Sequence, residues 1–382
     1  MLRYEWNQIP WPRLEVSVFK LQKRIYRASQ CGNVKSLHRL QRLLLNSRSA
    51  RLLAVRRVTQ DNQGRKTAGI DGVKNLTQKE RLQLADTLSL KEQKSTPVRR
   101  IWVPKPGKTE KRPLGIPTMK ERARQALIKM TLEPEWEAKF GPNSYGFRPG
   151  RSCHDACEAL FISLRMKPAF VLDADISGCF DNIEHEPLLK KLNTTATIKK
   201  LIKSWSKAGA LEGSVFHATE RGTPQGSIIS PLLANVALHG LEQDTKEALA
   251  DELFQYEKVR TGKASHRKAQ QALSIIFYAD DFVVLHRSKD IVLKAKAFIE
   301  EWLKNVGLEL KDSKTRITHT LETLGEDKAG FDFLGFTVRH YSDKRSEKGH
   351  KLLIKPSRES EKRHANAIGK SLKNYGVPLK RQ

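Results

Sequence analysis

The 382-residue chain is poor in cysteine and in long apolar runs, and each shortage excludes a class of protein. Four cysteines at irregular spacing are too few for a disulfide framework in a chain of this length, which favours a reducing compartment. No run of about 18 uninterrupted apolar residues occurs, and the N-terminal stretch MLRYEWNQIP contains no apolar signal core. We therefore expect a cytoplasmic protein that is neither secreted nor inserted in a membrane.

Zinc-finger spacing is also lacking. The stretch CHDAC, Cys153 to Cys157, is accompanied by no second Cys/His pair at the spacing of a zinc site. Buried cysteines on a helix explain this stretch better than a metal centre. Internal repeats and low-complexity tracts are absent too, which excludes repeat architectures.

Positive charge, by contrast, is abundant and unevenly distributed. The net charge is +28: residues 1–120 hold 27 Lys and Arg against 8 Asp and Glu, residues 344–382 hold 12 against 3, and residues 121–343 hold 31 of each. Two basic flanks around a neutral body favour a polyanion bound along its backbone, with an affinity that falls with added salt. A solubilising surface and a membrane surface are the alternatives, and no basic amphipathic helix with a strong apolar face supports the second.

Helical and strand patterns alternate irregularly along the chain, which predicts an α+β fold rather than repeated βαβ units. Helical spacing of apolar residues predicts two basic helices over residues 16–58, broken near Gly32 and Asn33. The other expected elements are a loop over 59–73, a β-hairpin with a basic tip over 99–118, a helix over 119–140, a strand over 170–176, an apolar helix opened by a Pro-Gln-Gly turn, and a polar insertion over about 242–271.

Two adjacent acids, Asp280 and Asp281, lie between apolar runs in SIIFYADDFVVL, which predicts a tight β-hairpin with the acids at its bend. On its own, this stretch is explained equally well by a solvated acidic turn. A third acid, Asp175, ends the expected strand FVLDADI, so Asp175 and Asp280 would reach one cation if the two elements shared a sheet. Clustered carboxylates persist when a divalent cation neutralises them, and Mg²⁺ prefers oxygen ligands completed by substrate phosphates. The pattern therefore indicates two-metal phosphoryl transfer.

Further motifs accompany these acids in a fixed order. They are TAGIDGV, VPKPGKTEKRPLGIPT, SYGFRPGRSCHDA, DADISGCFDNIEH, RGTPQGSIISPLLANVAL, FYADDFVVL, GLELKDSKTRI and FDFLGF. Over about residues 5–340 the set resembles the reverse transcriptases encoded by group II introns, also called intron maturases. Each motif alone is weak, but the ordered set is highly specific. The resemblance implies a right-hand polymerase with fingers, a palm built on an antiparallel sheet, and a basic helical N-terminal extension.

The resemblance also implies a role for each matching residue. Asp175 and Asp280 would be the main Mg²⁺ ligands, with Asp281 as the supporting acid of the catalytic trio. Contacts to the nucleotide would come from Lys105, Arg112, Phe180, Gln225 and Lys314, and contacts to nucleic acid from Arg148, Arg151 and Gly226.

Within this set, Phe180 would screen the 2′ position of the incoming sugar and Arg112 would hold the triphosphate. Lys314 would be a candidate general acid for pyrophosphate. The structural alternatives are core packing for Phe180, RNA-backbone contacts for Arg112 and Lys105, an ordinary turn at Gln225, and a solvated Lys314.

Three segments are expected: an N-terminal extension over residues 1–92, fingers and palm over 93–345, and a partial thumb or maturase segment over 346–382 with room for one or two helices. FDFLGF would form the strand pair that supports the primer end. The implied partners are a group II intron RNA, a DNA target that supplies the primer, and deoxynucleoside triphosphates, in a ribonucleoprotein that is monomeric or dimeric.

The expected function is RNA-directed DNA synthesis for a group II intron. The short final segment leaves two alternatives open: a non-catalytic RNA-binding splicing factor, and a reverse transcriptase serving a host or defence system. A metal-dependent nuclease also uses paired acids, but the fingers-like and Pro-Gln-Gly elements have no role in one.

Overall fold

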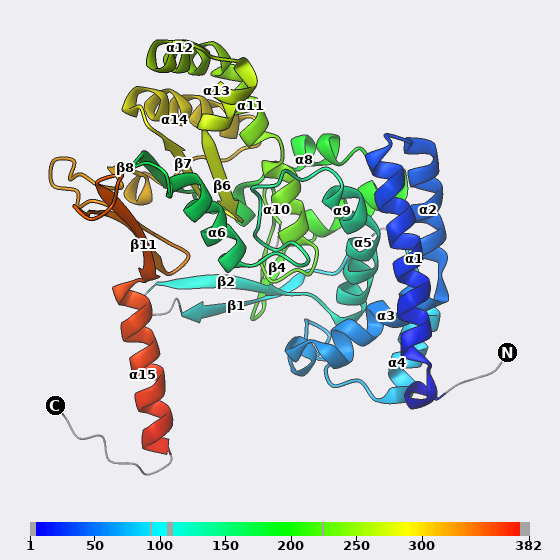
Figure 1. Ribbon diagram of the computed structural model, residues 1–382. Coiled ribbons are helices and arrows are strands. Elements are labelled where there is room, and N and C mark those ends of the chain that lie inside the picture. Colours follow the sequence, from blue (N-terminus) through cyan, green and yellow to red (C-terminus); the bar gives the residue numbers. More distant parts are fainter. Residues whose placement is uncertain (1–4, 92–93, 105–109, 224, 375–382) are drawn as a thin grey trace. The chain divides into compact units, whose positions relative to one another are not determined.

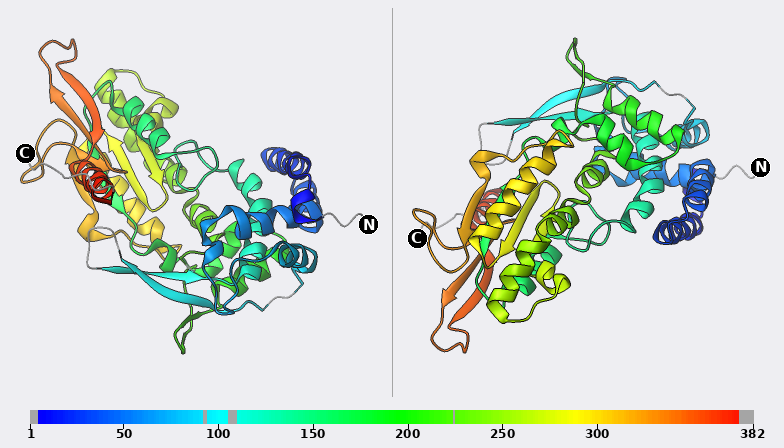
Figure 2. Two further views of the ribbon diagram at one scale, coloured as in Figure 1. Left: turned by 90° about the horizontal axis from the view of Figure 1, so that it is seen from below. Right: turned by 90° about the horizontal axis from the view of Figure 1, so that it is seen from above.

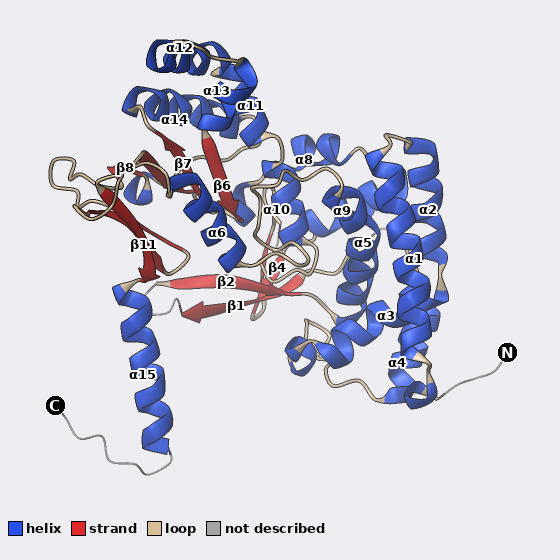
Figure 3. Ribbon diagram, in the orientation of Figure 1, coloured by secondary structure: helices blue, strands red, loops and turns tan. Residues whose placement is uncertain are grey.

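The computed structural model describes the chain apart from residues 1–4, 92–93, 105–109, 224 and 375–382, and it divides into two compact units. The first unit consists of Met1–Gly141, Ser177–His239 and Leu303–Glu309, and the second of Pro142–Ile176, Gly240–Trp302 and Leu310–Gln382. Their elements are labelled in Figure 1 and coloured by type in Figure 3. Both units mix helices with antiparallel strands, which confirms the expected α+β fold.

Helices dominate the N-terminal part of the first unit. Residues 16–58 form three helices instead of the two expected, because Ser47 ends one helix and its side chain caps the next by accepting from the Ala50 amide. The predicted break at Gly32 and Asn33 is confirmed, and Asn33 caps the second helix. The helices of this part are α1 (Trp11–Gln30), α2 (Val34–Asn46), α3 (Arg48–Arg56) and α5 (Met119–Glu137), and α1 packs against both α2 and α5.

The segment after α3 is held in place by one buried guanidinium. It consists of short helical turns, η2 (Arg57–Asp61) and η3 (Gln63–Lys66), and is followed by α4 (Gln78–Thr87). Arg122 of α5 donates to the carbonyl oxygens of Gly64 (2.8 Å), Thr67 (2.7 Å) and Pro117 (2.8 Å). Burial lowers the pKa of Arg122, and the nearby charge of Asp71 partly offsets this effect. One side chain therefore ties the turn over residues 64–67 to the start of α5.

The sheet of the first unit has the order β2-β1-β4-β5. Its strands are β1 (Val98–Pro104), β2 (Lys111–Ile116), β4 (Ala210–Glu212) and β5 (Val215–His217). β1 and β2 form the predicted antiparallel hairpin, whose tip at residues 105–109 lies outside the described residues, while β1 and β4 run parallel. The remaining helices of this unit are α7 (Cys179–Asn182), α8 (His185–Leu192), α9 (Ala196–Ser206) and α10 (Ser230–Leu238).

The second unit contains two antiparallel sheets, with orders β6-β7-β3-β8 and β11-β10-β9. Their strands are β3 (Phe170–Asp175), β6 (Ser274–Tyr278), β7 (Asp281–His286), β8 (Arg316–His319), β9 (Phe331–Phe333), β10 (Phe336–Ser342) and β11 (His350–Pro356). Side chains from both sheets and from α6 (Cys153–Leu164) share one buried core that includes Leu160, Val171, Val283, Phe331 and Val338. Figure 2 shows the long arms of the β10–β11 hairpin side by side.

The predicted polar insertion is helical, with α11 (Leu241–Ala248), α12 (Ala250–Thr261) and α13 (His266–Ala272). After β7 comes α14 (Lys289–Lys304), and after β11 the final described element is a single helix, α15 (Arg358–Asn374). FDFLGF forms the expected strand pair, β9 and the start of β10. Among the described helices none is both long and apolar enough to span a membrane.

Candidate active site

The acidic stretch of the second unit forms the predicted hairpin. β6 and β7 pair through Tyr278 and Asp281, and only Ala279 and Asp280 lie between them. Ala279 has a φ of +61°, which is uncommon for a residue with a Cβ and typical of the first residue of some tight hairpin turns. Gly146 lies against this turn so closely that a Cβ at residue 146 would stand 2.3 Å from the Ala279 nitrogen. The turn is therefore fixed by its own geometry and by a packed neighbour.

The sheet brings the third acid to this turn. β3 runs antiparallel to β7, and their register places Asp175 opposite Asp281. The Ile176 amide donates to the Asp280 carbonyl oxygen at 3.3 Å, which ties the end of β3 to the turn. The three acids that the sequence singles out are thus brought together at one end of one sheet.

Lys314 joins the three acids from the segment before β8. The Lys311 amide donates to the Asp175 carbonyl oxygen at 2.8 Å, and a 3-10 turn over Asp312–Lys314 follows. The Lys314 ammonium then donates to the Asp175 carboxylate in a short ion pair. Two residues back along β3, Asp173 forms a separate ion pair with Arg316 at 3.1 Å.

The surroundings of Asp280 and Asp281 raise the pKa values of both carboxylates. Although the Asp281 side chain faces solvent, the protein atoms around its carboxylate raise its pKa to about 6, and the charges of Asp280 and Asp175 add to this. Burial likewise raises the pKa of Asp280. For Lys314, burial lowers the pKa, but the bond to Asp175 and the neighbouring acids outweigh it, so the net shift is upward.

The chemistry of these donors fits a divalent cation. Three carboxylates at one strand end supply hard oxygen ligands, and burial, followed by the charge of neighbouring acids, raises the pKa values of Asp280 and Asp281. The Asp175 carboxylate bonds to Lys314 instead, and across the described parts of the chain no three Asp, Glu, His or Cys side chains are grouped to hold a metal ion.

Other predicted site residues lie in the first unit. Gln225 donates its side-chain amide to Asp181 at 2.7 Å, and the Gly115 amide of β2 donates to the Gln225 carbonyl oxygen at 2.6 Å. The half-buried Phe180 accepts from the Thr223 amide through its carbonyl oxygen at 2.6 Å. These contacts border a pocket of about 430 Å³ that Arg100, Trp102, Asp181, Arg221 and Gln225 help to line.

Gly226, next in the Pro-Gln-Gly turn, has a φ of +94° and lies so close to β2 that a Cβ would stand 2.7 Å from the Gly115 carbonyl oxygen. Only glycine fits this position, so the turn packs directly on the strand. Arg112 is exposed on β2, opposite Val103 in the register. Lys105 lies outside the described residues.

The two arginines expected to bind nucleic acid make intramolecular contacts in the second unit. Arg148 is buried and donates to the Ser144 carbonyl oxygen at 2.7 Å. Arg151 is exposed, donates to the Pro142 carbonyl oxygen at 3.1 Å and lies over the Tyr145 ring at 5.3 Å. Both guanidinium groups therefore support the segment that packs on the β6–β7 turn.

Sequence reasoning missed three residues of these sites. Arg100 and Trp102 lie on one face of β1, and an alternating strand pattern that places both beside the Pro-Gln-Gly turn could have pointed to them. Gly146 is part of the motif SYGFRPGRSCHDA, which does not show why residue 146 is a glycine. The reason is its close approach to the acidic turn.

A fold with this acidic hairpin is that of a right-hand polymerase. The structure of apo telomerase from Candida tropicalis, truncated from its C-terminal domain, matches with a TM-score of 0.50 at 13% identity, covering 69% of this chain and 55% of that one. At this identity the likeness concerns the fold alone, and it agrees with the expected architecture.

The chain belongs to the reverse transcriptase (RNA-dependent DNA polymerase) family, whose model matches residues 103–338, and the N-terminal domain of reverse transcriptase matches residues 6–88. It is 31% identical to Protein YkfC of Escherichia coli over 89% of this chain and 91% of that protein. It is 32% identical to the group II intron-encoded protein LtrA of Lactococcus lactis subsp. cremoris over 64% of this chain and 47% of that protein. The chain thus spans about half the length of LtrA and is of the group II intron type.

Proposed function

We propose that this chain synthesises DNA on an RNA template for a group II intron. The observation that carries the proposal is the meeting of Asp175, Asp280 and Asp281 at one end of a sheet, in a chain of the reverse transcriptase family. The pKa of about 6 for Asp281 supports it, because burial first and the charges of Asp280 and Asp175 second disfavour the ionised carboxylate, and a bound cation would offset both effects.

In this proposal Asp175 and Asp280 hold Mg²⁺ and Asp281 supports them. Bound there, Mg²⁺ would activate the primer 3′-hydroxyl and neutralise charge on the leaving pyrophosphate. The 3′-hydroxyl gives its proton to solvent, and its oxygen bonds to the α-phosphorus of the nucleotide as the bond to pyrophosphate breaks. Lys314, whose raised pKa keeps it protonated at neutral pH, is the group that gives pyrophosphate a proton.

The nucleotide would be held by Arg112 and Lys105 at its triphosphate, with Phe180 screening the 2′ position of its sugar and Gln225 beneath the templating pair. The bond from Gln225 to Asp181 supports this role, because it fixes the amide at the edge of a pocket large enough for a ligand. Contacts to the nucleic acid itself are assigned to Arg148, Arg151 and Gly226.

The partners proposed are a group II intron RNA and a DNA target that supplies the primer, assembled as a ribonucleoprotein. The net charge of +19 over residues 1–120 and of +9 over residues 344–382 supports binding along a phosphate backbone. LtrA, which shares 32% identity with this chain, is itself described as group II intron-encoded.

A second candidate function is RNA binding in intron splicing without catalysis. One observation favours it: the Lys314 ammonium already occupies the Asp175 carboxylate, and the acids do not converge as a ready metal site in the described part of the chain. Under this alternative the acids have only a structural role, held by Lys314.

Primer extension separates the two candidates. Wild-type protein and the Asp280→Ala/Asp281→Ala variant are each given an RNA template, a DNA primer, Mg²⁺ and deoxynucleotides. The polymerase proposal expects extension by the wild type alone. Equal extension by both refutes the catalytic assignment, and no extension by either, with tight salt-sensitive RNA binding, favours the splicing function.

A further inference from the structure

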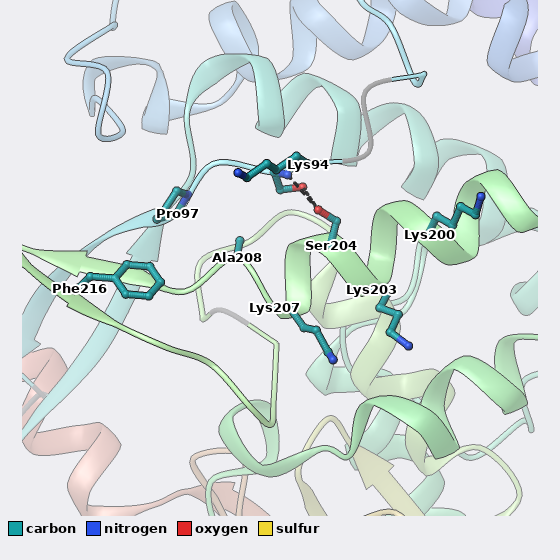
Figure 4. Close-up of a pocket in the computed structure, with 9 residues that line it drawn as sticks. Lys94, Pro97, Lys200, Lys203, Ser204, Lys207, Ala208 and Phe216 are labelled. Atoms are coloured by element: carbon teal, nitrogen blue, oxygen red, sulfur yellow. Dashed lines mark hydrogen bonds between the residues drawn. The ribbon is translucent and has the colours of Figure 1, made fainter.

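A groove rich in lysine lies in the first unit, apart from the Gln225 pocket. Its volume is about 540 Å³, within the range of ligand-binding cavities. It is lined by Lys94, Ser95, Pro97, Lys200, Lys203, Ser204, Lys207, Ala208 and Phe216 (Figure 4). We call it the lysine groove. None of these described lining residues is acidic, so the groove presents four positive charges to whatever it holds.

Three of the lysines come from α9 and its C-terminal end, and Lys94 comes from the segment that precedes β1. Lys200 and Lys203 are three residues apart on the helix, and Lys207 is its C-cap residue. The opposite side is buried through Ile198, Leu201, Ile202 and Trp205. Figure 4 shows the side chains of Lys203 and Lys207 extending in the same direction, while that of Lys200 extends in another. The charges are thus mounted on a rigid, anchored element.

Two contacts fix the walls of the groove. The Trp205 indole donates to the Glu121 carboxylate of α5 at 2.5 Å, which anchors α9. The Ser95 amide donates to the Ser204 hydroxyl at 2.9 Å, and this hydroxyl lies 2.9 Å from that of Ser95. These bonds join the segment of Lys94 to the helix, so the backbone that carries the four lysines is held in place without a bound ligand.

An exposed aromatic ring completes the groove. Phe216 of β5 is 56% exposed, so its ring is available to a ligand in the groove. Its ring lies against Gly209, where a Cβ would stand only 2.4 Å from it. The missing side chain at residue 209 therefore gives the ring a flat backing while leaving it open to solvent.

Lysines that follow a phosphate backbone, together with an aromatic ring that stacks on a base, are the parts from which single-stranded nucleic-acid sites are built. We propose that the lysine groove binds a single-stranded segment of RNA, with phosphates at Lys200, Lys203 and Lys207 and a base on Phe216. The inference rests on the proposed RNA-templated function, because it takes RNA as the natural polyanion of this chain. Glu186, which pairs with Lys203 at 2.9 Å, is exposed and would be displaced by phosphate.

Binding is measured by fluorescence anisotropy with a labelled oligouridylate in EDTA, across a range of salt concentrations. The test variant is Lys200→Gln/Lys203→Gln/Lys207→Gln. Its matched control is Lys74→Gln/Lys79→Gln/Lys190→Gln, which removes the same charge from three exposed lysines outside the groove. Each lost phosphate contact lowers the slope of log K against log salt by about 0.7, so the test variant should lose about 2 in slope.

Phe216→Ala tests the stacking. It should weaken oligouridylate binding about tenfold and leave binding of a duplex RNA of equal length unchanged, since paired bases are already stacked. Any one of three results would overturn the inference. The triple lysine variant could bind with wild-type affinity and salt slope, the matched control could lose as much affinity as the triple variant, or Phe216→Ala could bind oligouridylate as tightly as the wild type.

The experiment also separates this inference from the proposed polymerase function. Asp280→Ala/Asp281→Ala should bind oligouridylate as the wild type does, because its acids are not part of the groove. If the wild type binds oligouridylate through the groove but extends no primer, the polymerase proposal is refuted and the groove proposal stands. If the wild type extends primers but the triple variant binds RNA as the wild type does, the groove proposal is refuted and the polymerase proposal stands.

Discussion

Gly146→Ala tests whether the acidic turn must stay where it is. The added methyl would stand 2.3 Å from the Ala279 nitrogen, 2.9 Å from the Tyr278 carbonyl carbon and 3.0 Å from the Ala279 Cα, all of which are backbone atoms. No rotamer change can relieve these contacts. The chain at residue 146 and the turn that carries Asp280 must therefore move apart.

The size of this movement follows from the contact distances. Ordinary contact begins near 3.4 Å, so the closest pair must separate by about 1.1 Å. Overpacking of this kind costs about 1–3 kcal/mol of folding free energy. A displacement of about 1 Å at a catalytic group can lower the rate about 100-fold, because reacting groups depend on precise orientation. The substitution should thus weaken catalysis far more than its cost in stability alone would.

Single-turnover primer extension on an RNA template measures this effect, with the melting temperature recorded in parallel. Gly349→Ala is the matched control: it lies in the second unit, its φ of +70° costs an alanine about 1–2 kcal/mol, and nothing lies within 4 Å of the added methyl. We expect both variants to lose stability and only Gly146→Ala to lose activity. Equal extension rates in the two variants would refute the reasoning.

Three further predictions follow from the charges. The pKa of Asp281 is raised to about 6, so the wild-type protein loses folding free energy as the pH rises from about 4 to 6 and this carboxylate ionises. In EDTA, the substitution Asp281→Asn should therefore raise the melting temperature at pH 8, and raise it much less at pH 4. Lys314→Met leaves Asp175 without its cation, so adding Mg²⁺ should raise the melting temperature of this variant more than that of the wild type. Glu121→Ala removes the carboxylate that pairs with the fully buried Arg124 at 2.7 Å and accepts from the Trp205 indole, and it should cost about 3–5 kcal/mol in urea unfolding, whereas Glu121→Leu/Arg124→Leu, which removes both charges, should cost less.

Each of these has a contrary outcome. The same gain from Asp281→Asn at both pH values would mean that its carboxylate is not perturbed. Identical Mg²⁺ shifts in wild type and Lys314→Met would show that Lys314 and metal do not compete. A double leucine variant as unstable as Glu121→Ala would place the cost in lost packing or in the lost Trp205 bond instead of in the buried charge.

The strands and the turn that hold the three acids were predicted correctly from local sequence patterns. The apolar runs on both sides of Asp280 and Asp281 leave a two-residue turn as the only polar point, and the structure forms β6 and β7 there. The strand ending at Asp175 was predicted to within one residue, β3 being Phe170–Asp175. In both cases a short buried strand is defined by the side chains of the strand itself.

Predictions failed where a single polar residue changes the backbone. The apolar spacing continues from Leu44 to Leu52 without a phase change, so periodicity gave no sign that Ser47 ends α2 and caps α3. Contacts between residues that are distant in sequence could not be predicted either. The parallel pairing of β4 with β1 and the bond from Lys314 to Asp175 depend on how the chain returns on itself. Local propensity carries no information about either.

The most direct test of the central claim compares two acids on one strand. Asp175 and Asp173 both lie on β3, but only Asp175 faces the hairpin acids in the register, while Asp173 pairs with Arg316. In single-turnover primer extension with Mg²⁺, Asp175→Asn should lower the rate about 100-fold or more, and Asp173→Asn should extend at close to the wild-type rate. Extension by Asp175→Asn at the wild-type rate would contradict the account.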